Sequence, residues 1–94
     1  MGRMIYSYQF PPNKRADACN VIEQARKANE ESLEVILASA MDETAGRICE
    51  ETFDLITAAE GILRKFPDAT IDAAYERVLE KNRMRGDWEN VYER

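Results

Sequence analysis

The chain has 94 residues, of which 45% are hydrophobic and 33% are charged, and its formal net charge is -5. This length allows one domain, and the acidic balance excludes the basic surface that nucleic-acid binding requires. The absence of histidine removes histidine-based catalysis and most zinc chemistry.

Ala, Glu, Arg and Leu are frequent and Gly and Pro are scarce, which favours helices. We therefore expect an all-α domain over residues 1–94, built as a helical hairpin or bundle of three to four helices. It divides into an extended arm at 1–12, a helical core at 13–86 and a tail at 87–94. No apolar run approaches the ~20 residues that span a bilayer, and no signal peptide is visible. We expect a cytoplasmic protein with no membrane contact.

The N-terminal arm holds the segment with strand-like composition, MIYSYQF at 4–10, and ends at Pro11-Pro12. A lone strand has no partner inside such a chain, so this arm is expected to pair with another chain or to pack on a helix.

The first helical pattern covers residues 14–41, with apolar residues at three- and four-residue steps and Asn13 as a suitable N-cap. It predicts one long helix, or two helices broken near Asn29. A short break at 42–44 follows, where Asp42 or Thr44 caps the next helix.

The second helical pattern covers residues 44–66 and contains Gly61, which costs about 1 kcal/mol in a helix interior and therefore indicates close packing. Arg64 and Lys65 suit the negative end of this helix. Pro67 ends it.

A third helix is expected at 70–84, capped by Asp68 or Thr70 and stopped by Gly86. In the tail, Trp88 and Tyr92 are expected to dock. Small helical chains often complete their core by oligomerising, and we expect the same here. The two cysteines, Cys19 and Cys49, are expected as buried small apolar residues. The residues expected to face inward are Ile71, Ala74, Tyr75, Val78 and Leu79.

Two pairs of carboxylates lie three residues apart, which places each pair on one helical face: Glu31 with Glu34, and Glu51 with Asp54. If the two helices pack antiparallel through a turn at 42–43, the pairs meet at one level, because each lies about eight residues from the turn. Four carboxylates without sulfur or imidazole select a hard cation, Mg²⁺ or Mn²⁺. On spacing alone, two solvated acidic helix faces explain the pattern equally well.

The order Glu30-Glu31-x-x-Glu34, sixteen intervening residues and Glu51-x-x-Asp54 resembles the signature of the MazG-like all-α nucleoside triphosphate pyrophosphohydrolases. Residues 27–36 and 50–63 are also similar to the metal helix and partner helix of the related phosphoribosyl-ATP pyrophosphohydrolases. LEKNRMRGDW at 79–88 resembles the Lys-Asn-x-x-Arg ending of many MazG-like chains. The resemblance covers roughly residues 15–88.

This resemblance implies a homodimer or homotetramer that uses Mg²⁺, with Mn²⁺ as a possible substitute, to hydrolyse a nucleotide to monophosphate and pyrophosphate. Glu30 is then a further ligand, a residue that supports the ligands, or a helper that orients water. Lys27, one turn before Glu31, is within reach of a phosphate. The implied metal ligands are Glu31, Glu34, Glu51 and Asp54; the catalytic acids are Glu30, Glu31 and Glu34; the substrate contacts are Lys27, Lys81, Asn82 and Arg85.

Other functions remain open at this point. Phosphoribosyl-ATP is an alternative substrate within the same class. A helical interaction module that offers its acidic face to a protein partner is the alternative from another class, and an acidic mimic of nucleic acid is a third.

Overall fold

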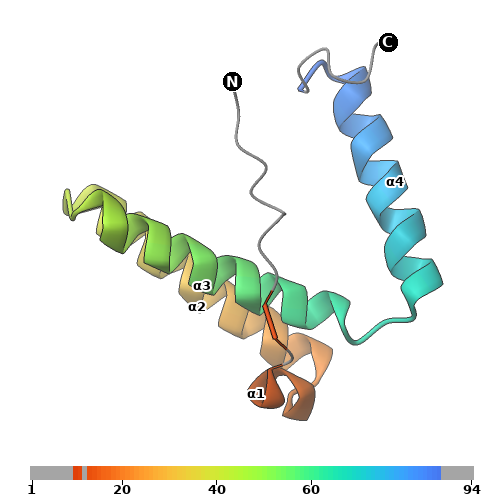
Figure 1. Cartoon of the computed structure of the whole chain (residues 1–94), viewed down its shortest axis with the longest axis horizontal. Coiled ribbons are helices and arrows are strands. Elements are labelled where there is room, and N and C mark those ends of the chain that lie inside the picture. Colours follow the sequence, from red (N-terminus) through yellow and green to blue (C-terminus); the bar gives the residue numbers. More distant parts are fainter. Residues whose placement is uncertain (1–9, 12, 88–94) are drawn as a thin grey trace.

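The computed structural model describes residues 10–11 and 13–87, and every element within them is a helix (Figure 1). This confirms the expected all-α class. The expected arm and tail, including Trp88 and Tyr92, lie almost wholly outside the described residues. The helices are α1 (Lys14–Ala18), α2 (Val21–Ala40), α3 (Ala45–Leu63) and α4 (Asp68–Met84).

The first helical pattern is divided after Ala18, so the predicted break near Asn29 is wrong. Asn20 and Glu23 explain the actual position. The Asn20 side chain accepts a hydrogen bond from the Glu23 N–H at 2.8 Å, and the Glu23 carboxylate accepts one from the Asn20 N–H at 2.9 Å. This reciprocal capping box satisfies two N–H groups that a helix start leaves without partners. Asn13 caps α1, as predicted.

A tight turn joins α2 to α3 and reverses the chain. Asp42 adopts a left-handed conformation with φ of 54°. Its N–H donates to the Ser39 carbonyl at 3.3 Å, and the Glu43 N–H donates to the Ala38 carbonyl at 3.1 Å. This is the Schellman pattern that ends many helices. Thr44, one of the two predicted caps, then caps α3 through its hydroxyl.

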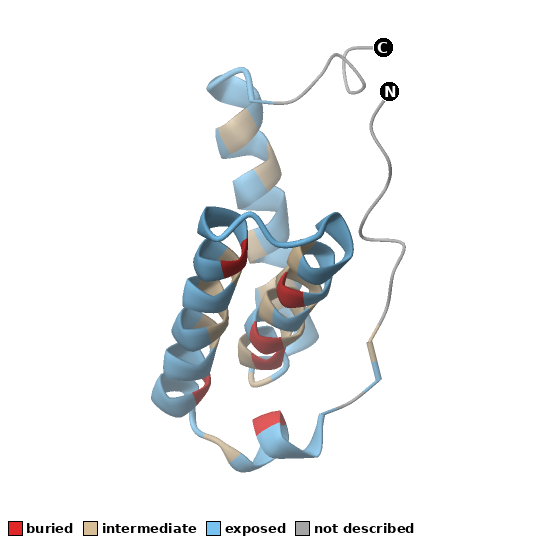
Figure 2. Cartoon of the chain, turned by 90° about the vertical axis from the view of Figure 1, so that its left-hand side faces the viewer, coloured by how far each residue is buried: buried red, intermediate tan, exposed pale blue. Residues whose placement is uncertain are grey.

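α2 and α3 pack side by side as an antiparallel hairpin, with α1 placed against one end of α3 (Figures 1 and 2). The buried apolar residues described are small: Ala16, Ala38 and Ala58. The buried Gln24 side chain of α2 crosses the seam and donates to the Ala58 carbonyl of α3 at 2.9 Å. Small side chains therefore allow the two helix backbones to approach closely.

Arg64 and Lys65, which follow α3, both donate hydrogen bonds to backbone carbonyls of earlier segments. The Lys65 ammonium donates to the Ala16 and Cys19 carbonyls at the end of α1. Arg64 pairs with Glu60 and donates to the Phe10 carbonyl at 2.8 Å. α1 is thus held against the end of α3 by a cation at its negative C-terminus.

α4 leaves the hairpin at a wide angle (Figure 1). It begins at Asp68, directly after Pro67, and none of its residues is buried. Tyr75 and Val78 are exposed, so the expectation that they face inward is wrong. Ile71, Ala74 and Leu79, the other three residues expected to face inward, are half-buried. The stop at Gly86 is confirmed by its φ of 76°.

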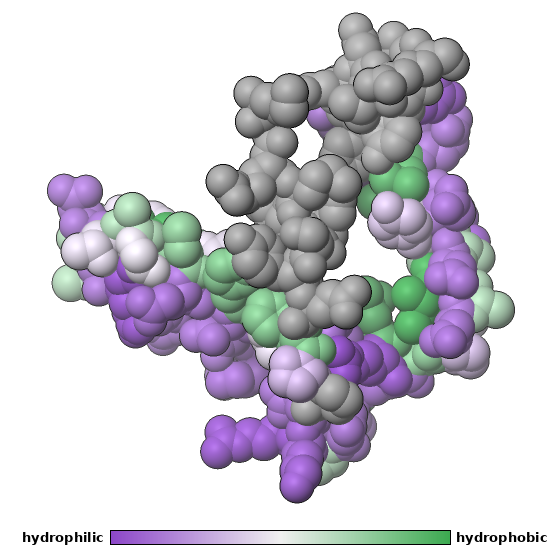
Figure 3. Space-filling model, in the orientation of Figure 1, coloured by the Kyte–Doolittle hydropathy of each residue, from purple (hydrophilic) through white to green (hydrophobic). Residues whose placement is uncertain are grey.

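Apolar surface is widely exposed in this arrangement, as Figure 3 shows along α3 and around its junction with α4. Cys19 is half-buried and Cys49 is exposed, so the expectation of two buried cysteines is wrong. None of the described helices is both long and apolar enough to cross a membrane.

Candidate metal centre

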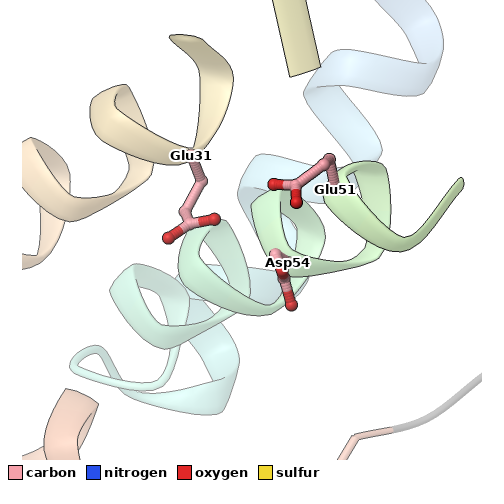
Figure 4. Close-up of side chains that lie close together, drawn as sticks. All are labelled: Glu31, Glu51 and Asp54. Atoms are coloured by element: carbon pink, nitrogen blue, oxygen red, sulfur yellow. The ribbon is translucent and has the colours of Figure 1, made fainter. Parts of the chain in front are cut away.

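Three carboxylates from two helices come together in the middle of the hairpin. Glu31 reaches from α2 toward Glu51 and Asp54 of α3 (Figure 4). One carboxylate oxygen from each lies within 4.8 Å of the others. We call these three residues the acidic trio. The antiparallel hairpin brings them to one level because Glu31 on α2 and the Glu51–Asp54 pair on α3 lie at similar distances from the shared turn.

The trio contains three of the four carboxylates in the two predicted pairs. Glu34, the fourth, is exposed on α2 and lies outside the trio. Its neighbour in the predicted catalytic set, Glu30, is also exposed. Glu34 is offset from Glu31 by the same three-residue step that separates Asp54 from Glu51, so the rotation of α2 against α3, and not the spacing, decides that Glu31 alone of its pair joins the trio.

Each of the two less exposed carboxylates has a cation one helical turn earlier. The Lys27 ammonium lies 2.8 Å from Glu31, and Arg47 lies 2.6 Å from Glu51. The side chains of Glu31 and Glu51 are only 14% and 6% exposed. A buried carboxylate is costly without such a partner. The two ion pairs therefore offset the cost of placing the Glu31 and Glu51 carboxylates between the helices.

The charges also act on Lys27. Its hydrogen bond to Glu31, followed by the negative charge of that carboxylate, raises the pKa of Lys27 above the ordinary lysine value. The charge of Glu30 acts in the same direction. The three acids of the trio outnumber the two cations beside them, and Arg47 is also shared with Glu50 at 3.8 Å. The cluster therefore keeps a net negative charge that can attract a cation.

Arg47 was not among the residues predicted from the sequence. The available signal was its position four residues before Glu51, which repeats the spacing of Lys27 before Glu31. Basic residues at that spacing are common on helix surfaces, so the pattern carries little information before the fold is known.

The donor set fits a hard divalent cation. All three groups offer oxygen, as Mg²⁺, Mn²⁺ and Ca²⁺ prefer. Glu31, Glu51 and Asp54 would hold such a cation, and their carboxylate oxygens, which lie within 4.8 Å of one another, would draw closer around it.

The predicted substrate contacts near the C-terminus lie on α4 or directly after it, away from the main α2–α3 packing. Arg85 donates to the Asn82 side chain at 2.7 Å and pairs with Asp87 at 3.1 Å. Lys81 is exposed. The structure therefore brings Lys27 to the trio, and places Lys81, Asn82 and Arg85 on a separate element.

The fold and the site together define an all-α helical hairpin with a carboxylate cluster between its two long helices. Comparison with protein-family models, with curated proteins and with solved structures gave no match.

Proposed function

We propose that the protein is a Mg²⁺-dependent nucleotide pyrophosphohydrolase of the MazG-like kind. The observation that carries this proposal is the convergence of Glu31, Glu51 and Asp54 from two antiparallel helices. The order and spacing of the acidic residues, which resemble that family, supply the substrate class. A nucleoside triphosphate is the leading substrate, and phosphoribosyl-ATP is the alternative.

Hydrolysis of a nucleotide pyrophosphate bond requires neutralisation of the polyphosphate charge and activation of a water molecule. A divalent cation supplies both when bound, because it stabilises charge on the phosphate oxygens and makes a water molecule more acidic. The trio would hold that cation. Water attacks a phosphorus atom, the bond to the bridging oxygen breaks, and monophosphate and pyrophosphate are released.

The exposed acids of α2 complete the proposed site. Glu34 lies one turn after Glu31 and joins the trio as a fourth ligand in this proposal. Glu30 or Glu34 accepts the proton that the attacking water loses. Lys27 would contact a substrate phosphate when Glu31 holds the cation. In the same proposal, Lys81, Asn82 and Arg85 contact phosphate or base in an assembly of two or four copies.

One observation favours the rival function, a helical module that presents its acidic face to a protein. Lys27 and Arg47 already pair with Glu31 and Glu51, so two of the three acids have cationic partners without any metal. Such networks also occur as purely structural features. The two functions differ in what Mg²⁺ does to the folded protein.

A magnesium titration of the melting temperature separates them. Binding to the folded state alone stabilises it by about 2.7 kcal/mol at a hundred times the dissociation constant. We expect the melting temperature to rise with Mg²⁺ and the rise to vanish in Asp54→Asn. Asp54 is exposed and its replacement is nearly isosteric, so the fold should survive. Asp72→Asn on α4 is the matched control and should keep the full response.

Activity is measured with a panel of nucleotides and pyrophosphate detection. We expect Mg²⁺-dependent pyrophosphate release from at least one nucleotide, lost in Asp54→Asn and in Glu34→Ala and kept in Asp72→Asn. Absence of both hydrolysis and a Mg²⁺-dependent melting shift would contradict the enzyme and support the interaction module.

A further inference from the structure

Two cations accompany the acidic trio, and each is paired in the order that is less favourable for a helix. Lys27 precedes Glu31 by four residues on α2, and Arg47 precedes Glu51 by four residues on α3. An isolated helix gains more from the opposite order, with the acid first, because that order suits the helix dipole. Support of the helix itself therefore does not explain these two pairs.

Two ion pairs away from the trio have the favourable order. Glu60 precedes Arg64 at the end of α3, and Glu80 precedes Arg83 on α4. In both of those pairs the acid and the base are exposed to a similar degree. At the trio, by contrast, the cation is more than half exposed while its acid is largely enclosed. The cations at the trio therefore compensate enclosed carboxylates, which are costly to bury alone.

The hairpin places these two cations at opposite ends of the trio. α2 runs toward the shared turn, and α3 runs away from it (Figure 1). Lys27 therefore lies one helical turn, about 6 Å, farther from the shared turn than Glu31, and Arg47 lies about 6 Å nearer to it than Glu51. The two positive side chains approach the trio from opposite directions along the hairpin.

Asp54 is the member of the trio without such a partner. It lies on α3 beside Glu51 and is exposed (Figure 4). Among the ion pairs within residues 10–11 and 13–87, none includes Asp54. Two acids of the trio thus have a counter-charge beside them, and the third is open to solvent.

We propose that Lys27 and Arg47 are built-in counter-ions of the trio, which keep the metal-free hairpin folded and also weaken the binding of a divalent cation. The first effect follows because an enclosed carboxylate that loses its partner destabilises the folded state. The second follows because a fixed positive charge beside the trio repels a cation placed there. This inference rests on the proposed function in one respect, since the trio must take a cation.

The decisive variant is Lys27→Met, which removes the charge and keeps a long side chain beside Glu31. Thermal unfolding in EDTA measures its stability without metal, and calorimetric titration with MgCl₂ at constant ionic strength measures its affinity for Mg²⁺. We expect a lower melting temperature than the wild type without metal, and Mg²⁺ binding tighter by on the order of tenfold. The difference in melting temperature should shrink as Mg²⁺ is added.

Two lysine variants are the matched controls. Lys14→Met removes the same charge on α1, which packs against the end of α3 remote from the shared turn. It should bind Mg²⁺ with the affinity of the wild type. Lys27→Arg keeps a positive charge beside Glu31 and should also bind Mg²⁺ as the wild type does.

Arg47→Met tests the second cation. We expect the same two changes, lower stability without metal and tighter binding of Mg²⁺, because Glu51 is the more enclosed of the two acids. If either methionine variant is unfolded in EDTA, circular dichroism follows its refolding as MgCl₂ is added. Refolding below the Mg²⁺ concentration that saturates the wild type supports the proposal, and a chain that stays unfolded contradicts it.

The remaining outcomes separate this inference from the proposed function. If the wild type binds Mg²⁺ and Lys27→Met binds it equally well or more weakly, the counter-ion role is overturned and the metal site stands. An equal gain of affinity in Lys14→Met also overturns it, because the effect would then belong to the net charge of the chain. If neither the wild type nor the two methionine variants bind Mg²⁺, both proposals fail.

Discussion

Gly61 lies where α3 packs against both α1 and α2. A Cβ atom built at this glycine would lie 2.8 Å from Nε2 of Gln24 and 3.0 Å from Cβ of Ala16. Gln24 cannot move aside without cost, because it is buried and donates to the Ala58 carbonyl. The close packing that the sequence predicted for Gly61 is therefore confirmed.

Gly61→Ala should lower the stability of the protein. The gain of up to about 1 kcal/mol in helix propensity is outweighed by overpacking, which costs about 1–3 kcal/mol, and by the disturbed buried hydrogen bond. Chemical denaturation measures the change. Gly46→Ala in the same helix is the control, since nothing lies within 4 Å of its Cβ position, and it should stabilise slightly. Equal effects at both glycines would contradict this account.

Glu80 and Arg83 form an exposed ion pair on α4, with 2.6 Å between the guanidinium and the carboxylate. The hydrogen bond from Arg83 lowers the pKa of Glu80 below the ordinary glutamate value. A lowered pKa in the folded state means that the pair stabilises the helix above the unfolded pKa of about 4.3. That contribution disappears as the pH falls through the folded pKa.

Arg83→Gln should raise the pKa of Glu80 toward its ordinary value, as followed by carbon NMR of the carboxyl group in an acid titration. Arg85→Gln should leave it unchanged, because Arg85 pairs with Asp87. A Glu80 titration that Arg83→Gln does not alter would show that the pair does not form in solution.

The turn between α2 and α3 decides how the hairpin closes. Its Schellman hydrogen bonds require a left-handed residue at Asp42, a conformation that strains most side chains and that glycine adopts freely. Gly86 occupies the equivalent position after α4, with φ of 76°. Asp42 therefore places a small backbone strain in the turn, which a glycine at this position would relieve.

Asp42→Gly should stabilise the protein by about 0.5–1 kcal/mol, because relief of the left-handed strain exceeds the added freedom of the unfolded chain. Asp42→Val should destabilise it by more than this amount, since a β-branched residue fits that conformation poorly. Thermal unfolding measures both. If valine were tolerated as well as glycine, the left-handed turn would be absent in solution.

At the scale of the whole molecule, one chain buries little apolar side-chain surface. The buried residues described are alanines, Gly61, Gln24 and Glu51, while many larger aliphatic side chains remain exposed. A domain of this length has a marginal core, and the exposed apolar side chains of α2 are surface on which further burial is available. The expectation from the sequence that another copy completes the core stays a prediction.

The sequence by itself determined the local features of this protein. Capping residues, helix stops and the pairing of acids along one helix depend on neighbours a few positions away, so Asn13, Thr44 and Gly86 could be assigned without the fold. The break at Asn20 was also encoded locally, by a capping box with Glu23 that the prediction overlooked.

Only the tertiary structure decided which acids meet. Register and rotation between α2 and α3 follow from contacts distant in sequence, such as Gln24 with Ala58. These contacts select Glu31 over Glu34 as the partner of α3, and they bury Glu51 beside Arg47. The direction of α4 could not be predicted from the sequence either. Its apolar stripe indicates that the helix packs against another surface but does not identify that surface.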